Sequence, residues 1–490
     1  MVIGVYSPMP AANASHRGSL FAVRCGAIVS LLLAGTLWSV WLWSRFCRFP
    51  SIPWNDMRLA PTIALAQGWP VYPSGASGTI NTWMYGPLPV LFMWPASWAS
   101  SAAGALLIAG GLTLALTLVP LALVCWLWPG DDDPATAWLG RTAALLLCLG
   151  AWPELHYSVI FSDNLAVACG LVGNLILLRA RGPGALWLAA AIATAAVACK
   201  QIALGIPLAQ VLWLGFTSGR RAALLHVMRC MVAGGVIGLG AIALFGFAGL
   251  WFTLVAIPGG LGWAPDVALR LKMVASELAL LLGLPAVVMI VWRREFSRPS
   301  LLLPALAWVC TLPLGLAGMM KVGGWTNSIH GLVLWLPPVL ATLFAARLSP
   351  ARFWSFSLAA GVIAAGSACG RILLEPDVRL RPQTAGYDEA AQIAAQYRNA
   401  VWFPVHPLVT LYSDHRYYHD EDGMYVHLRA KKPVNSEQAA QHLPPAMRAM
   451  AFRNDWTDWG IARRMLPPNS REIPIGNWNV YSGVAGEKKP

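Results

Sequence analysis

Charged residues are scarce in this chain. Asp, Glu, Lys and Arg make up only 12% of its 490 residues, whereas 57% of the residues are hydrophobic. Soluble globular proteins average about 25% charged residues. A single water-soluble core of this length does not bury so much apolar surface. The composition therefore excludes an ordinary soluble protein.

The sequence also lacks the signatures of several common site classes. Its nine Cys residues lie mostly within hydrophobic runs and form no CxxC pair, which argues against a zinc site or a disulfide framework. Walker A, GxSxG and HExxH sequences are absent. The net charge of +13 is no evidence for a nucleic-acid partner, because most Lys and Arg residues lie in short loops where membrane topology explains them.

Hydrophobic runs long enough to cross a bilayer are what the chain has instead. About eleven runs approach the length that spans roughly 30 Å of hydrocarbon. They lie at 25–44, 102–128, 142–161, 164–179, 185–200, 201–217, 230–252, 273–292, 300–319, 328–346 and 353–370. The first run is longer than the apolar part of a signal peptide, and no small-x-small cleavage site follows it. The sequence therefore predicts an all-α polytopic membrane protein.

Loop charges orient this predicted protein. More Lys and Arg residues fall in the inner loops if the N-terminus is cytoplasmic, as the Arg pairs at 220–221 and 293–294 illustrate. Arg45 and Arg48 argue the other way. An odd number of spans then places the C-terminal region outside. We expect a cytoplasmic tail at 1–24, a transmembrane domain at 25–370 that includes an outer loop at 45–101, and a soluble extracytoplasmic domain at 371–490.

The C-terminal region has the pattern of a small mixed α/β domain. Residues 386–399 have helical spacing, while 400–405 and 408–413 are rich in β-branched and aromatic residues and predict short strands. A polar segment follows, with His415, His419 and the acids of 420–422. It is either a metal site or a solvated turn, and the absence of a second ligand cluster favours the turn.

The outer loop is too polar to cross a membrane and contains the acid Asp56. Residues 57–68 have an apolar side that suits a helix lying in the interface. A carboxylate at Asp56 can act as a general base on an acceptor, or it can cap that helix. The stretch 88–98 predicts an in-plane helix or a short span.

Further polar residues are expected at the same outer face. Asp163, at a junction of two spans, could hold a sugar hydroxyl, a metal or a cation, or could cap a helix. The cations could bind the phosphate of a lipid-linked sugar, or could extend to the interface. Trp54 could stack on a sugar ring or belong to an aromatic belt. These candidates are Asp163, Lys200, Arg270, Lys272, Lys321, Asn327, Tyr85 and Trp54.

The order of these features resembles that of the GT-C superfamily of glycosyltransferases, which includes protein O-mannosyltransferases and the aminoarabinose transferase of lipid A. One span is followed by a long outer loop with an early acid, Asp56, and a closing Tyr85-Gly86-Pro87-Leu88. Residues 139–172 resemble the family's third and fourth spans, and 190–208 resemble its small-residue span followed by Lys. The acid lies in Asn-Asp-Met rather than in an Asp-Glu or Asp-x-Asp pair, and Gly86 replaces a proline.

The resemblance implies an inverting glycosyltransferase of the bacterial inner membrane that takes part in cell-envelope polysaccharide biosynthesis. It would move a sugar from a polyprenyl-phosphate donor to a glycan, lipid or protein acceptor at the outer face. Asp56 and Asp163 would be catalytic, and the other candidates would bind substrate. This donor is the one small-molecule substrate that the resemblance implies; no cofactor is certain, and a divalent metal is possible but not indicated. The alternative is a transporter or flippase for lipid-linked sugars. The long outer loop favours the transferase, because a transporter needs access from both faces.

Overall fold

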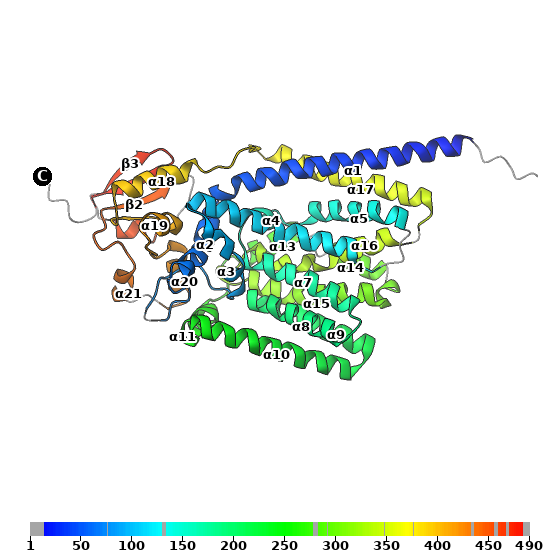
Figure 1. Ribbon diagram of the computed structural model, residues 1–490, viewed down its shortest axis with the longest axis horizontal. Coiled ribbons are helices and arrows are strands. Elements are labelled where there is room, and N and C mark those ends of the chain that lie inside the picture. Colours follow the sequence, from blue (N-terminus) through cyan, green and yellow to red (C-terminus); the bar gives the residue numbers. More distant parts are fainter. Residues whose placement is uncertain are drawn as a thin grey trace, which may run out of the picture.

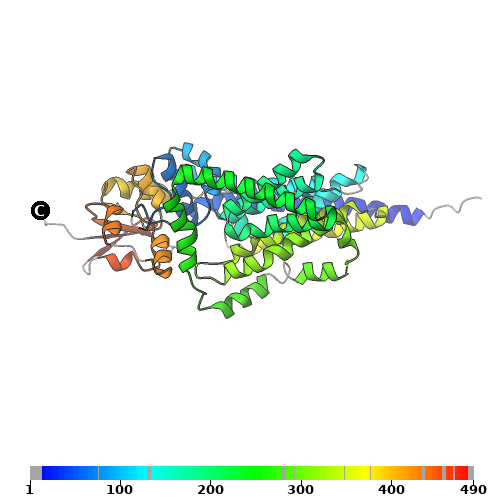
Figure 2. The ribbon, with the colours of Figure 1, turned by 90° about the horizontal axis from the view of Figure 1, so that it is seen from below.

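The computed structural model of the chain describes residues 14–75, 77–129, 134–277, 283–291, 293–346, 348–375, 377–432, 436–454, 459–466 and 470–483. Most of these residues form helices that pack side by side into an elongated bundle (Figures 1 and 2). The last part of the chain forms a small domain at one end of the bundle. Helix α1 (Ala14–Arg48) begins at the opposite end.

The bundle consists of helices with strongly apolar sequences. After α1 its main helices are α4 (Ala102–Leu127), α5 (Pro134–Ala151), α7 (Ser162–Arg179), α8 (Pro183–Cys199), α9 (Gly205–Ser218), α10 (Arg220–Phe245), α15 (Pro299–Met319), α16 (Leu336–Ala345) and α17 (Pro350–Leu374). Shorter helices are α6 (Leu155–Ser158), α11 (Phe247–Trp251), α12 (Ile257–Gly260), α13 (Val267–Glu277) and α14 (Leu284–Val291). The 3-10 helices η3 (Gln201–Leu204) and η7 (Thr326–Trp335) lead into α9 and α16.

The predicted fold class is confirmed. Among the described residues, 7 helical stretches are long and apolar enough to cross a membrane. Each predicted span coincides with one helix or with consecutive helices, although part of 273–292 lies outside the described residues. The chain is thus a multi-pass membrane protein.

Ion pairs join the end of α1 to the end of α17. Arg45 lies 2.5 Å from Glu154 and 2.6 Å from Glu375, and Arg48 lies 3.0 Å from Glu375. The Glu375 side chain is buried between the two guanidinium groups. The positive charge of Arg45 and Arg48 is therefore neutralised locally, which weakens these two residues as evidence on membrane orientation.

Short helices of the outer loop lie across the end of the bundle. Helix α2 (Pro53–Ala66) is followed by α3 (Leu88–Phe92) and the 3-10 helix η2 (Trp94–Trp98). Pro53 begins α2, a position that suits its fixed φ angle and missing N–H. The predicted helix after Asp56 is confirmed, but it is buried on nearly all sides, because residues 59–64 are all buried, rather than only along the apolar side of Leu59 and Ile63.

Neither candidate acid caps a helix, so that alternative was wrong for both. Ile52 precedes α2 and Phe161 precedes α7, whereas Asp56 and Asp163 lie within the first turn of their helices. Their carboxylates instead bind groups from other parts of the fold, as described below.

A four-stranded sheet forms the centre of the C-terminal domain. Its strands are β1 (Val401–Trp402), β2 (Ala449–Arg453), β3 (Arg471–Ile475) and β4 (Trp478–Ser482), in the order β1-β2-β4-β3. The pair β1–β2 is parallel, and the other two pairs are antiparallel. Helices α18 (Ala385–Gln396), α19 (Pro407–Ser413), α20 (Glu421–Arg429) and α21 (Ser436–Gln441) complete the domain, which confirms the predicted mixed α/β class.

Two local predictions in this domain were wrong. Residues 408–413 belong to helix α19 rather than to a strand, because Pro407 begins a helix and the Asp56 carboxylate accepts a hydrogen bond from the Leu408 N–H at its first turn. The segment around Asp420 is not a solvated turn. His419, Asp420 and Glu421 are fully buried. Their side chains accept hydrogen bonds from backbone N–H groups of neighbouring loops.

Candidate functional site

A buried ion pair lies where three helical elements of the bundle meet beside the loop of residues 45–101. Lys200 follows the last residue of α8, Asp163 lies in the first turn of α7, and Asn327 lies at the start of η7. The Lys200 Nζ lies 2.8 Å and 2.7 Å from the two Asp163 carboxylate oxygens. The Asn327 amide donates to Asp163 Oδ2 over 3.0 Å. Lys200 and Asp163 are only 6% and 3% exposed, so their charges depend on each other.

Tyr85 completes this group. Its ring centroid lies 5.4 Å from the Lys200 Nζ, within range of a cation–π interaction. The neighbouring Gly86 donates its backbone N–H to the Cys199 carbonyl oxygen, and a Cβ atom at Gly86 would lie only 1.7 Å from the Ala198 carbonyl oxygen. Glycine at this position, a departure from the family's proline, therefore lets the loop lie directly against the end of α8.

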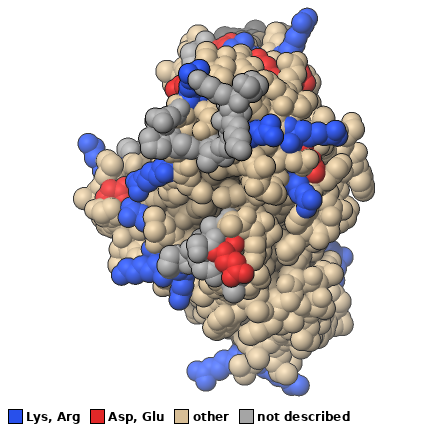
Figure 3. All heavy atoms as spheres, turned by 90° about the vertical axis from the view of Figure 1, so that its left-hand side faces the viewer, with Lys and Arg blue, Asp and Glu red and all other residues tan. Residues whose placement is uncertain are grey.

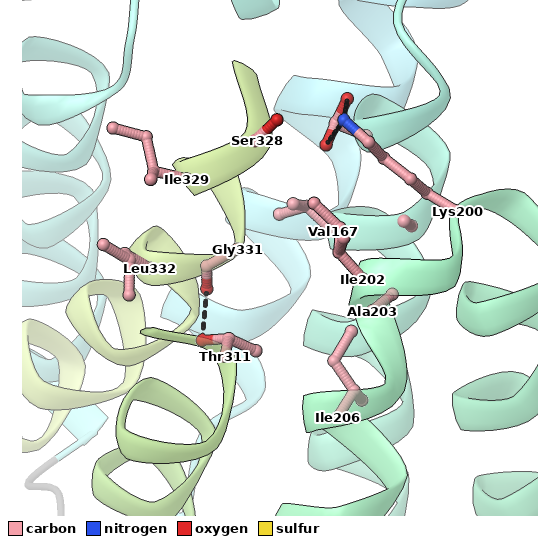
Figure 4. Close-up of a pocket in the computed structure, with 12 residues that line it drawn as sticks. Val167, Lys200, Ile202, Ala203, Ile206, Thr311, Ser328, Ile329, Gly331 and Leu332 are labelled. Atoms are coloured by element: carbon pink, nitrogen blue, oxygen red, sulfur yellow. Dashed lines mark hydrogen bonds and ion pairs between the residues drawn. The ribbon is translucent and has the colours of Figure 1, made fainter. Parts of the chain in front are cut away.

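A small enclosed cavity lies beside the ion pair (Figure 4). Its volume is about 20 Å³, enough for one water molecule. Ser328 and Lys200 lie at one end of this cavity, and apolar side chains such as Ile206 and Leu332 line the other.

A larger apolar groove begins at Gly86 and Gln201, which adjoin Tyr85 and Lys200 in the chain. Its volume is about 390 Å³, and α8, α10 and α11 form its walls. Residues such as Gly238 line it along α10. Small residues on α8 and α10 leave this space open between the two helices.

Asp56 lies in a different environment from Asp163. It is 0% exposed, and its oxygens accept hydrogen bonds from the Tyr387 hydroxyl over 2.7 Å and from the Leu408 N–H over 2.9 Å. Both donors belong to the C-terminal domain. Burial raises the pKa of Asp56 to about 7, and the two hydrogen bonds only partly oppose this effect. Asp56 thus joins α2 to the C-terminal domain.

The remaining cations contact backbone carbonyls or solvent. Arg270 forms an ion pair with Asp266 at 2.9 Å and donates to the Met319 and Lys321 carbonyl oxygens. Lys321 donates to the Pro258 carbonyl oxygen over 3.1 Å. Lys272 is exposed. Arg270 and Lys321 therefore fix the loop that precedes Asn327.

Trp54 lies on the other side of the outer loop. The Arg58 guanidinium lies 5.1 Å from its ring centroid, and the Trp459 ring lies 6.4 Å away in an edge-on arrangement. The structure thus brings Asp163, Lys200, Asn327 and Tyr85 together, but places Asp56 and Trp54 against the C-terminal domain.

Sequence reasoning missed the residues by which the C-terminal domain holds the outer loop. Asp420 accepts hydrogen bonds from the N–H groups of Thr82 at 2.9 Å and Gly423 at 2.6 Å, and His419 accepts one from Ile80 at 2.9 Å. The Thr82 hydroxyl also binds Asp422. Asp420 directly precedes the helical run of α20, and an acid at this position commonly caps a helix. This pattern is the sequence signal that could have pointed to a structural role for Asp420.

In the described part of the chain, no group of three or more His, Cys, Asp and Glu residues is arranged to hold a metal ion. The polar groups around Lys200 instead contact one another. They form a buried cation, its carboxylate partner and an aromatic face, and the neighbouring residues Gly86 and Gln201 line an apolar groove.

No family model and no curated protein sequence matches this chain. Among solved structures, ArnT from Cupriavidus metallidurans in the apo state has a similar fold. The TM-score is 0.56 at 12% sequence identity, over 92% of this chain and 97% of that one. Arabinosyltransferase EmbB from Mycobacterium smegmatis also matches, with a TM-score of 0.36, 13% identity and coverage of 92% of this chain and 46% of that one. The likeness to ArnT confirms the GT-C type of fold that the sequence resembles.

Proposed function

We propose that this protein is a membrane glycosyltransferase that moves a sugar from a polyprenyl-phosphate donor to a glycan, lipid or protein acceptor. One observation carries the proposal. The Lys200 ammonium group is paired with Asp163 and lies over the Tyr85 ring, and an apolar groove between α8 and α10 begins at Gly86 and Gln201, the residues next to Tyr85 and Lys200 in the chain. A cation beside an apolar channel suits a ligand with a phosphate and a long hydrocarbon chain.

The donor would occupy both features. Its polyprenyl chain would lie in the groove between α8 and α10, where only apolar surface and small side chains are available. Its phosphate would bind Lys200 in place of part of the contact with Asp163. Because the pair is buried, its electrostatic interactions are stronger than in water.

The reaction would require little besides this cation. The acceptor hydroxyl oxygen would form a bond to the anomeric carbon as the bond from that carbon to the phosphate oxygen breaks, and the proton of the hydroxyl would pass to water. The electron pair would stay on the phosphate, where Lys200 would stabilise it without protonation of the leaving group. Asp163 would hold Lys200 in position. The sequence-based roles of Asp56 as the acceptor's base, and of Arg270, Lys272 and Lys321 as phosphate ligands, are not used in this mechanism.

The two ends of the bundle support an assignment of sides. The small domain lies at one end of the bundle, and the described N-terminal residues lie at the other. We propose that the N-terminus is cytoplasmic and that the C-terminal domain lies on the outer face of a bacterial inner membrane. The domain would then help to bind the acceptor.

The test is sugar transfer by the purified full-length protein in nanodiscs, with radiolabelled polyprenyl-phosphate sugars as donors. We expect transfer to an acceptor or to water, and a loss of about 100-fold in Lys200→Ala, the size seen when one charge-stabilising group is removed. Lys200→Arg should retain part of the activity. Arg416→Gln, which changes an exposed charge elsewhere, is the control.

The same preparation distinguishes the transporter alternative. A wild-type protein that moves labelled lipid between the leaflets of a liposome, but transfers no sugar, would be a transporter. Full transfer activity in Lys200→Ala would contradict the proposed role of Lys200.

A further inference from the structure

A row of aromatic rings and guanidinium groups begins on the surface of the C-terminal domain. The Arg429 guanidinium lies 5.4 Å from the Tyr425 ring centroid, and both residues belong to α20. The Tyr425 ring stacks on that of Trp459, with centroids 4.4 Å apart and planes 11° from parallel. Arg429 is exposed, and Trp459 is 40% exposed.

The row continues into the outer loop. The Trp459 ring meets the Trp54 ring edge-on at 6.4 Å. The Arg58 guanidinium lies 5.1 Å from the Trp54 centroid and 4.3 Å from that of Phe161. Phe161 directly precedes the first turn of α7, which carries Asp163. The row thus leads from an exposed surface to the residues beside the Lys200 ion pair.

Buried acids hold the row in place. The Glu421 carboxylate accepts hydrogen bonds from the Ile461 N–H at 2.7 Å and the Ala462 N–H at 2.9 Å, next to Trp459. The Trp459 side chain hydrogen-bonds Asp422, which also binds Thr82 in the outer loop. A surface ring fixed in this way is preorganised for a ligand, because little side-chain freedom remains to be lost on binding.

Exposed basic residues adjoin both chain segments that form the surface end of the row. Lys431 and Lys432 follow α20 directly, and Arg464 lies close after Trp459 in the chain. All three residues are exposed, as is Arg429. Figure 3 shows Lys and Arg side chains projecting around this end of the molecule. A ligand with negative charge is therefore attracted to this end.

We propose that this row, made of Arg429, Tyr425, Trp459, Trp54 and Arg58, is the binding track for an acidic saccharide acceptor. The C–H faces of sugar rings pack on aromatic faces, whose electrons carry partial negative charge. The guanidinium groups pair with carboxylate or phosphate substituents. The identification of this saccharide as an acceptor rests on the proposed transferase function, whereas its binding does not.

Direct binding tests the track without a donor. The full-length protein in nanodiscs is titrated calorimetrically with tetragalacturonate, with its neutral methyl ester, and with a phosphorylated mannopentaose. We expect both acidic probes to bind, and the methyl ester to bind about tenfold more weakly at low salt. Binding of the acidic probes should weaken further as salt is raised, because exposed charges are screened.

Substitutions locate the binding. Trp459→Ala should weaken all probes about tenfold, Trp459→Phe should retain most affinity, and Arg429→Gln should weaken only the acidic probes. The control is Trp98→Ala, since Trp98 is 76% exposed on η2 and lies outside the row.

Two results would overturn the track. One is the absence of binding by both acidic probes, and the other is wild-type affinity in Trp459→Ala and in Arg429→Gln. A wild-type protein that binds the acidic probes but transfers no sugar overturns the proposed function and leaves the saccharide site standing. Transfer that is unaffected by Trp459→Ala, in a protein that binds the probes through the row, overturns the assignment of the ligand as the acceptor.

Discussion

Asp56 and Asp163 are both buried carboxylates in the first turn of a helix, yet their partners differ in kind. Asp163 binds the Lys200 ammonium and an Asn amide, all within the membrane domain. Asp56 binds a hydroxyl and a backbone N–H that both come from the C-terminal domain. One acid has a counter-charge, and the other has only neutral donors.

The sequence analysis assigned Asp56 and Asp163 to one catalytic site, whereas their different partners indicate two separate tasks. A general base must come within hydrogen-bond reach of the proton it removes, and both Asp56 oxygens are occupied by protein donors. The carboxylate of Asp163 instead fixes a cation next to a groove. We therefore expect the Asp163 pair to control chemistry and Asp56 to control how the C-terminal domain is held.

The largest effect is expected from the ion pair itself. Asp163→Leu or Lys200→Met alone leaves one buried charge without its partner and should lower the free energy of unfolding by roughly 3–5 kcal/mol. The double variant replaces the pair with apolar groups and should recover most of that loss, but it should transfer no sugar. Denaturant melts and transfer assays on all four proteins form a double-mutant cycle. Sugar transfer by the double variant would contradict a role of Lys200 in chemistry.

Gly86 offers a smaller disturbance of the same site. In Gly86→Ala the new methyl group would overlap the Ala198 carbonyl oxygen, so the loop must move and carry Tyr85 away from Lys200. We expect sugar transfer to fall about 100-fold, the effect of a misplacement on the order of 1 Å. Gly184→Ala is the control, because Gly184 lies on α8 with open space around it. Equal activities of the two variants would show that the loop position does not matter.

The spans and the order of the outer loop could be predicted because hydrophobic length and turn chemistry are local properties. Lys200 could be singled out for the same reason, since a cation between two apolar runs is unusual. Its pairing with Asp163 and Asn327 could not be derived, because those contacts join three distant segments of the chain. Sequence placed all three residues at one face but contained no information on their distances.

The C-terminal domain was harder to predict, because tertiary contacts overrode local preference there. Residues 408–413 have strand-forming side chains, yet a proline and the distant Asp56 carboxylate start a helix at this point. The acids of 420–422 looked solvated because acidic residues are mostly exposed. They are buried because backbone N–H groups of the outer loop and of residues 459–462 need acceptors.

Asp56→Asn distinguishes the two tasks directly. Burial makes the folded state bind a proton at Asp56 more tightly than the unfolded chain, whose carboxyl pKa is near 3.8. The stability that Asp56 contributes is therefore fully present below about pH 4 and is lost as pH rises toward the folded pKa of about 7. Asp56→Asn should flatten this dependence between pH 5 and 8 in thermal melts.

The same variant should keep sugar transfer within about threefold of wild type, because uncharged Asn can still accept the Leu408 hydrogen bond. A large loss of transfer with an unchanged melting profile would instead establish Asp56 as the base. Asp388→Asn, which removes an exposed carboxylate of α18, is the control for charge alone.

Tyr387→Phe should give the smallest effect. It removes one hydroxyl that donates to Asp56, so the free energy of unfolding should fall by about 1 kcal/mol. The hydrogen bond lowers the pKa of Asp56, so its loss raises that pKa above the wild-type value. In Tyr387→Phe the decline of stability with pH should then continue to a higher pH than in wild type. The double variant Asp56→Asn/Tyr387→Phe should have the same pH profile as Asp56→Asn alone, because no carboxylate remains to titrate. Melts of the two single variants and the double variant across pH 5 to 9 measure this. A Tyr387→Phe profile that ends at the wild-type pH would show that Tyr387 does not stabilise the Asp56 carboxylate.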